Sequence, residues 1–188
     1  KKFPIRILNA EPVGYCRKAQ ELLSQIGQVD ELGSDESLSD RIANYEVLVV
    51  RLGYQVNSLL IDKAFNLKAI VTATTGLDHV DVNYAKDKGI NVLSLQGEYE
   101  FLRSVTATAE HTWGLLLNLV RNIPEAFNSV KQGRWERDQF RGHDLCGYNL
   151  GIVGVGRIGE KIALMGHAFG MSVGGFDPYT PNRVNGIQ

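Results

Sequence analysis

The apolar positions in the first half of the chain alternate between short continuous runs and helical spacing. Runs typical of buried strands lie at 5–8, 46–50, 67–73 and 90–93, and helical patterns lie at 15–26, 59–65 and 81–88. Parallel strands need long crossover connections, and helices in those connections bury both faces of the sheet. The alternation therefore predicts an α/β unit with a parallel sheet over residues 1–97.

A long apolar helix dominates the pattern after that unit. Leucine or valine occupies positions 115, 116, 117, 119 and 120, on nearly every side of a helix expected from Thr106 to Arg121. A helix that is apolar all round is covered on more than one face, so we expect a core or interface helix. Pro124 breaks or restarts it, and a polar segment then leads to a further strand at 148–153.

A glycine motif, GVGRIG at 154–159, follows that strand and precedes a helical pattern that ends at Gly170. Gly154 permits a tight turn, Gly156 lets the backbone approach a pyrophosphate, and Gly159 lets helix and strand pack closely. The free N–H groups and the positive dipole end of the helix suit a diphosphate. The motif predicts nucleotide binding, against the alternative of a merely structural turn.

A second strand, expected at 171–176, ends at an aspartate. Asp177 lies 18 residues after Gly159, where a carboxylate can accept hydrogen bonds from both hydroxyls of the adenosine ribose. The same carboxylate would repel the additional phosphate of NADP. We therefore predict NAD as the cofactor.

Composition limits the classes of binding partner and leaves the fold prediction unchanged. The 188 residues suit one large or two small domains, and a formal charge of −1 leaves no basic field for nucleic acid or an anionic membrane. No segment has the apolar length of a membrane helix, and no residues have metal-ligand spacing. Cys16 and Cys146 are interpreted as free thiols in a reducing compartment, so we expect the cytoplasm.

Two positions in the first unit are candidates for anion binding. Thr74, Thr75 and Gly76 follow the strand at 67–73, where a glycine-containing turn can expose successive N–H groups; the alternative is a helix-capping turn before Asp78 and Asp81. Arg51 directly follows the strand at 46–50, either as a ligand for an acidic substrate or as an ordinary surface arginine.

Three phrases together resemble the D-2-hydroxyacid dehydrogenases, in the order in which that family has them. They are "ATTGLDHVDV", "TAEHTWGLLLNLVRNIPEA" and "KQGRWERDQFRGHDLCGYNLGIVGVGRIGEKIALMGHAFGMSVGGFDP". The resemblance implies a flavodoxin-like substrate domain at 1–97, followed at 98–188 by the first part of a Rossmann NAD-binding domain. It also implies hydride transfer between NAD and C2 of a 2-oxo or D-2-hydroxy acid, and a homodimer built through the NAD-binding domain and the helix at 106–121.

The family's site residues carry over position by position. The loop that binds the substrate carboxylate falls on Thr74, Thr75 and Gly76, and an arginine that reaches acidic substrates in several members falls on Arg51. The amides that contact the pyrophosphate fall on Arg157 and Ile158, beside the three glycines of the motif.

The chain departs from the family pattern at 96–103 and in its catalytic residues. The segment "QGEYEFLR" lengthens a linker that is short in one branch of the family, so it could narrow the cleft or decorate the dimer. The resemblance places the catalytic arginine, glutamate and histidine well downstream of Asp177. We therefore assign no catalytic residue here, and His79, His111, His143 and His167 do not substitute.

Only one strand-helix-strand unit follows residue 148, which would leave a sheet edge unpaired and an apolar face uncovered. We therefore expect these residues to be part of a longer polypeptide and to lack turnover alone. Two other classes stay open: a catalytically silent NAD sensor or corepressor-like dimer, and a nucleotide-dependent methyltransferase. The phrases "ATTGLDHVD" and "GRW" argue against the methyltransferase.

Overall fold

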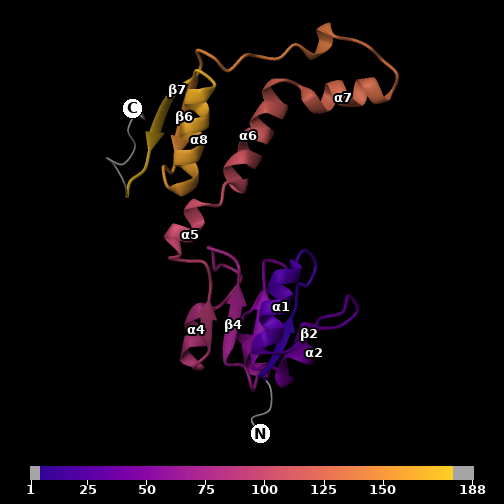
Figure 1. Cartoon of the computed structure of the whole chain (residues 1–188), viewed down its shortest axis with the longest axis vertical. Coiled ribbons are helices and arrows are strands. Elements are labelled where there is room, and N and C mark those ends of the chain that lie inside the picture. Colours follow the sequence, from indigo (N-terminus) through magenta and orange to yellow (C-terminus); the bar gives the residue numbers. More distant parts are fainter. Residues whose placement is uncertain (1–4, 180–188) are drawn as a thin grey trace. The chain divides into compact units, whose positions relative to one another are not determined.

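The computed structural model describes residues 5–179. The chain divides into two compact units, 1–98 and 99–188, and each has its own sheet (Figure 1). The division falls next to the one expected at 97. The substrate and cofactor roles of the two units stay predictions.

The first unit holds a five-stranded sheet in the order β2-β1-β3-β4-β5, and every neighbouring pair is parallel. The strands are β1 (Ile5–Asn9), β2 (Gly27–Glu31), β3 (Val47–Val50), β4 (Ala69–Thr72) and β5 (Asn91–Leu93). The prediction of an α/β unit with a parallel sheet is confirmed. The hydrophobic pattern missed β2, because this edge strand contains only one large apolar residue, Val29.

The helices of this unit are α1 (Arg17–Ile26), α2 (Leu38–Arg41), the 3-10 turn η1 (Ile42–Asn44), α3 (Ser58–Lys63) and α4 (Val82–Asp87). Helices α3 and α4 each begin at a residue whose side chain caps the helix N-terminus. Asn57 accepts a hydrogen bond from the Leu60 amide at 3.1 Å, and Asp81 accepts one from the Tyr84 amide at 3.1 Å.

The core of the first unit surrounds its central strands. Leu48, Val49 and Val50 of β3 are essentially inaccessible, as are Ile70 of β4 and the Tyr45 ring. Helix α1 differs from its prediction, because no residue of it is buried and Leu22 and Ile26 are exposed. Helix α1 packs along the edge strand β2. Because β2 has only one large apolar side chain, it provides little apolar surface against which α1 could bury its own residues.

The second unit comprises α5 (Tyr99–Arg103), α6 (Ala107–Val120), α7 (Ile123–Lys131), η2 (Asp138–Phe140), β6 (Asn149–Val153), α8 (Arg157–Ala168) and β7 (Ser172–Phe176). Strands β6 and β7 are parallel, with α8 as their crossover. Helix α6 packs on α8, where the Trp113 and Phe169 rings stack at 4.7 Å. Asn122, in the left-handed region, separates α6 from α7 at the expected Pro124 break.

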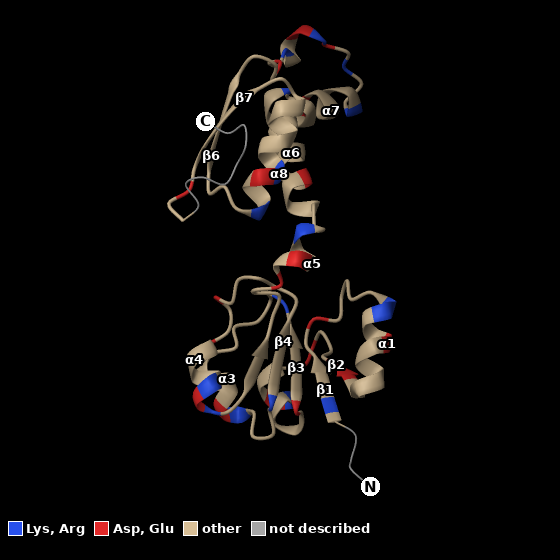
Figure 2. Ribbon diagram, turned by 60° about the vertical axis from the view of Figure 1, so that its left-hand side comes forward, with Lys and Arg blue, Asp and Glu red and all other residues tan. Residues whose placement is uncertain are grey.

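Figure 2 shows basic and acidic residues interspersed along the ribbon of both units. No helix within residues 5–179 is long and apolar enough to cross a membrane. The same residues contain no group of three or more His, Cys, Asp or Glu arranged to hold a metal ion.

Candidate functional site

The turn between β6 and α8 is built by three glycines in three different environments. Gly154 has a φ of +90°, a conformation that favours glycine, and its amide donates to the Phe176 carbonyl at 2.8 Å. A Cβ on Gly159 would lie 2.3 Å from the Gly154 carbonyl oxygen, so only glycine permits this contact. A Cβ on Gly156 would meet nothing within 4 Å. The backbone at Gly156 is therefore open to an approaching ligand.

The start of α8 presents unpaired amides to that open side. Within the described residues, the N–H groups of Arg157, Ile158 and Gly159 have no acceptor, and the first intrahelical bond runs from the Glu160 amide to the Gly156 carbonyl at 2.9 Å. Successive free amides at a helix N-terminus attract anions, because the helix dipole adds to them. The arrangement is chemically suited to a phosphate.

The side chains next to the turn are drawn away from it. Arg157 Nη1 donates to the Leu102 carbonyl at 3.3 Å, and Lys161 Nζ donates to the Arg103 carbonyl at 2.8 Å. Both acceptors are final carbonyls of α5, which have no partners inside their own helix. The segment at 96–103, unexplained by the sequence, therefore includes a short helix bound to the first turns of α8.

Asp177 follows β7 directly and lies beside the glycine turn. In the parallel register Phe176 pairs with Val153, so the residues after each strand, Asp177 and Gly154, leave the sheet at the same edge. Asp177 Oδ1 accepts a hydrogen bond from the Tyr179 amide at 2.9 Å. Its Oδ2 has no partner within residues 5–179, so this half-buried carboxylate keeps acceptor capacity for a ligand hydroxyl.

The predicted substrate turn follows β4. Within the described part of the chain, the amides of Thr74, Thr75 and Gly76 have no acceptor, while the Thr74 carbonyl accepts from the Leu95 amide at 3.0 Å. Successive free N–H groups at the carboxyl end of a parallel strand are chemically suited to an anion. The Asp78 carboxylate lies next to this turn, 3.6 Å from the position of a Cβ on Gly76, and opposes an anion there.

Arg51 lies at the same edge of the same sheet. Strands β3 and β4 are neighbours, and Val50 pairs with Thr72, so Arg51 and the turn at 74–76 both follow the carboxyl ends of adjacent strands. Arg51 Nη1 donates to the Val13 carbonyl at 3.3 Å. Burial raises the pKa of the neighbouring Tyr15 phenol, as does the charge on Cys16, while the Arg51 charge acts in the opposite direction.

The sequence reasoning missed one residue that holds this edge. Both carboxylate oxygens of Glu11 accept backbone amides of the loop after β3, from Arg51 and, at 3.0 Å, from Gly53. Glu11 could have been found from the sequence because it is a polar residue soon after a buried strand. Such residues lie together at the carboxyl edge of a parallel sheet.

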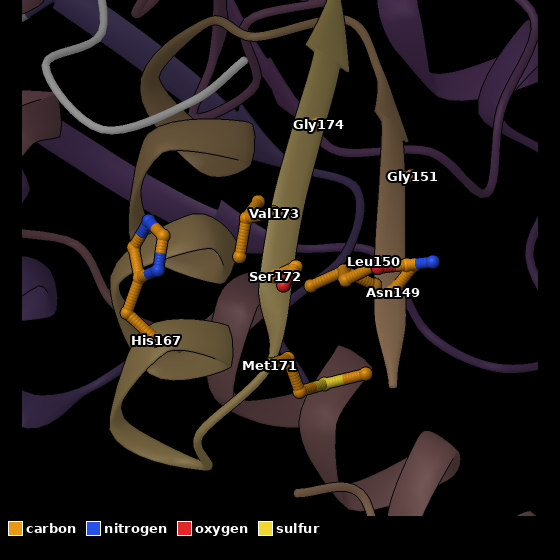
Figure 3. A pocket seen from close by; sticks show the side chains of 8 residues that line it. All are labelled: Asn149, Leu150, Gly151, His167, Met171, Ser172, Val173 and Gly174. Carbon is orange, nitrogen blue, oxygen red and sulfur yellow. The ribbon is translucent and has the colours of Figure 1, made fainter. Parts of the chain in front are cut away.

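Two hollows of the second unit lie away from the glycine turn. One, of about 490 Å³, is lined by Asn149 and Ser172 near the starts of the two strands and by His167 near the end of α8 (Figure 3). The other, of about 250 Å³, lies between α7 and Trp135. Neither lies at the N-terminus of a helix, where successive free amides and the helix dipole favour an anion, so nucleotide chemistry is better supported at the turn.

Comparison with known proteins identifies the class. Residues 113–187 match the family model described as "D-isomer specific 2-hydroxyacid dehydrogenase, NAD binding domain". Residues 113–187 are therefore similar to the NAD-binding domain of the D-isomer specific 2-hydroxyacid dehydrogenases, and NAD is the cofactor of the matched domain. The resemblance inferred from the sequence and the cofactor prediction are confirmed.

Individual relatives are named as phosphoglycerate dehydrogenase and related enzymes. The chain is 39% identical over 182 residues to D-3-phosphoglycerate dehydrogenase of Methanocaldococcus jannaschii, covering 96% of this chain and 33% of that protein. It is 40% identical over 152 residues to hydroxypyruvate reductase of Thermotoga maritima, covering 81% of this chain and 48% of the relative. The chain thus spans about a third to a half of these relatives.

A solved structure with a similar fold is D-lactate dehydrogenase from Aquifex aeolicus, complexed with NAD and lactic acid. It aligns with a TM-score of 0.74 and 28% identity, covering 92% of this chain and 51% of that one.

Proposed function

We propose that these residues belong to an oxidoreductase that transfers hydride between NAD(H) and C2 of a 2-oxo or D-2-hydroxy acid. The observation that carries the proposal is the turn from Gly154 to Gly159, with an open backbone at Gly156 and three free amides beside it. Similarity to the NAD-binding domain of the family supports the reaction class. When bound, NAD supplies the hydride-accepting and hydride-donating ring, and the chain supplies binding and orientation.

In this proposal the cofactor is held along one edge of the β6-α8-β7 unit, at the carboxyl ends of its two strands. Gly154, Gly156 and Gly159 shape the turn, and the amides of Arg157 and Ile158 donate to the pyrophosphate. Asp177 accepts from the adenosine ribose, and its negative charge disfavours the additional phosphate of NADP. The observation favouring this role is its position beside Gly154 with one carboxylate oxygen free.

The substrate carboxylate in this proposal binds the amides of Thr75 and Gly76, with Thr74 shaping the turn. Arg51, on the neighbouring strand end, interacts with a second acidic group of the substrate. Support comes from the unpaired amides and from the shared sheet edge. The first unit then acts as a flavodoxin-like substrate domain, since its strand order 2-1-3-4-5 is the flavodoxin-like order.

We also propose a homodimer formed through the second unit and the helix at 106–121. Leu115 and Leu119, one turn apart in the apolar second half of α6, are 59% and 75% exposed. An apolar stripe of this kind suits a second copy of the same surface. The same feature supports the alternative function, a catalytically silent NAD sensor that acts as a dimer. For either function the proposed compartment is the cytoplasm, where Cys16 and Cys146 stay reduced.

One assay separates the enzyme from the sensor. NADH is mixed with pyruvate, hydroxypyruvate, glyoxylate or 3-phosphohydroxypyruvate, and absorbance of the reduced nicotinamide is followed. We expect the full-length polypeptide to oxidise NADH with at least one acid, and the 188 residues alone to bind NADH without turnover. Tight NADH binding by the full-length polypeptide with no oxidation in any mixture would support the sensor and overturn the enzyme.

A further inference from the structure

A row of polar side chains lies behind the turn at 74–76. His79 Nε2 and Thr72 Oγ1 are 3.3 Å apart, Thr72 Oγ1 and Thr74 Oγ1 are 3.0 Å apart, and Thr74 Oγ1 donates to the Gly76 carbonyl at 2.8 Å. Thr72 and His79 are 2% and 4% exposed. The row therefore runs from the buried interior to the exposed turn.

The directions of these hydrogen bonds follow from hydrogen counting. A carbonyl oxygen only accepts, so the single hydroxyl hydrogen of Thr74 points at Gly76. Between the two threonines the donor must then be Thr72, which uses its only hydrogen there. The remaining bond, from His79 to Thr72, therefore has the imidazole N–H as donor. Every bond in the row points toward the turn.

This direction fixes the tautomer of a buried histidine. The Nε2 atom carries a hydrogen, whereas a hydrogen on the Nδ1 atom would have no acceptor among the described residues. Within residues 5–179 the buried Nδ1 atom has no hydrogen-bond partner. The backbone of His79 is itself held, because its carbonyl accepts from the Val56 amide at 2.8 Å and Val80 bridges to Val56. The ring is thus a fixed donor at the end of the row.

We propose that His79 is a positioning residue for the turn at 74–76, acting through Thr72 and Thr74. Its N–H sets the direction of the Thr72 hydroxyl, which in turn commits the Thr74 hydroxyl to the Gly76 carbonyl. The bond from Thr74 to the Gly76 carbonyl holds the turn in the conformation in which the amides of Thr75 and Gly76 have no acceptor within the described residues and remain available to an anion. The last step rests on the proposed function of this turn; the hydrogen-bond row itself does not.

The first test measures the tautomer in the 188-residue chain. Long-range ¹H–¹⁵N spectra of ¹⁵N-histidine distinguish a protonated from an unprotonated ring nitrogen, and His79→Gln identifies the His79 signals by their loss. We expect a hydrogen on Nε2 and none on Nδ1. A His79 ring with its hydrogen on Nδ1 would overturn the proposal.

The second test compares variants that keep or remove the row. His79→Gln and Thr74→Ser keep a donor or a hydroxyl, whereas His79→Leu and Thr74→Val remove it. The readout is hydrogen exchange of the Leu95 amide, which is bonded to the Thr74 carbonyl. We expect exchange to accelerate at least about tenfold in Thr74→Val and His79→Leu, relative to amides of β1 in the same sample, and to stay within about twofold in the conservative variants. Thr74→Val changes a half-buried side chain and should disturb folding less than a change at the buried His79. It therefore still gives a measurable exchange rate if His79→Leu does not fold.

The third test uses D-3-phosphoglycerate as the probe. We expect it to shift the Thr75 and Gly76 amide signals, with an affinity at least about tenfold weaker in Thr74→Val than in Thr74→Ser. If the tautomer and exchange results hold and the probe does not bind, the row stands and the proposed substrate role of the turn fails. If the probe binds equally to both variants, the turn's role stands and the positioning role of His79 is wrong.

Discussion

The turn between β6 and α8 contains three glycines in six residues. Each glycine has different surroundings, so each is required for a different physical reason. Gly154 satisfies a backbone conformation, Gly159 avoids a backbone clash, and Gly156 keeps an outward surface bare. A substitution at each position therefore affects a different measurable property.

A matched pair of alanine variants separates packing from ligand approach. Gly159→Ala places a Cβ against the Gly154 carbonyl, so we expect a loss of about 1–3 kcal/mol in unfolding free energy. Gly156→Ala meets no protein atom within 4 Å, so we expect stability to change little while NAD affinity falls. Denaturant unfolding and calorimetric NAD titration measure the two effects. Equal NAD affinity in Gly156→Ala and the unchanged chain would contradict the proposed pyrophosphate approach.

In the proposed function, Asp177 determines the preference for NAD over NADP. Asp177→Ala removes a charged acceptor for the ribose hydroxyls, and we expect NAD binding to weaken by about 1.5–3 kcal/mol, roughly tenfold to hundredfold. NADP binding should weaken less or improve, because the repelling charge is gone. Asp144→Ala is the control, since the Asp144 side chain is 89% exposed. Unchanged affinity for both nucleotides in calorimetry would remove Asp177 from the site.

At the scale of elements, a helix or strand could be predicted from the sequence when it packs against many apolar neighbours. Strand β3 and helix α8 were predicted because a buried strand and a packed helix need continuous or periodic apolar residues. Strand β2 was missed because Gln28, Asp30 and Glu31 give an edge strand no apolar pattern. The hydrogen-bond row from His79 was not predictable, because its direction depends on through-space contacts between residues two to seven apart.

The edge strand β2 is held by polar contacts that give it a pH dependence. Burial acts to raise the pKa of Asp30, but hydrogen bonds from Tyr45 and Arg6 outweigh it and lower that pKa below its usual value. A lowered carboxyl pKa stabilises the fold above the unfolded-state value, and this stabilisation is lost as pH falls through the folded-state value.

Tyr45→Phe tests that contact while keeping the buried ring. We expect a loss of about 1 kcal/mol at neutral pH, because the hydroxyl bond to Asp30 is removed. The difference between the variant and the unchanged chain should narrow as pH falls through the Asp30 titration. Urea unfolding at several pH values measures it, and a difference that is constant down to the lowest pH would argue against Asp30 as the titrating partner.

Helix α6 carries the proposed contact between copies. Leu115→Glu combined with Leu119→Glu places charges on its exposed stripe, and we expect the dimer dissociation constant to rise at least about tenfold. Phe65→Glu, an equally drastic change at a residue that is 83% exposed in the first unit, should leave it unchanged. Light scattering across a dilution series gives the answer, and a double variant that dimerises like the Phe65→Glu control would place the interface elsewhere.

At the scale of the whole molecule, the chain consists of two units with separate sheets and separate buried clusters. A cluster formed within one unit contributes to the unfolding of that unit alone. Ligand binding to one folded unit stabilises that unit by mass action.

NAD should therefore protect one unit selectively. At a concentration of one hundred times Kd we expect a gain of about 2.7 kcal/mol in the unit from 99 onward. Amide exchange should slow at 150–177 and stay unchanged in the strands β1 to β5. A uniform slowing across both units, or a single unfolding transition that NAD shifts as a whole, would contradict independent units.

The pairing of α5 with α8 has a consequence for protein engineering. The side chains of Arg157 and Lys161 donate hydrogen bonds to the last carbonyls of α5, a helix that begins more than fifty residues earlier in the chain. The glycine turn and residues 99–103 should therefore be transferred together when this site is grafted onto another protein. A chimaera that replaces the glycine turn and α8 but keeps α5 would remove the two basic side chains that donate to the Leu102 and Arg103 carbonyls. Grafts should therefore exchange both segments or neither.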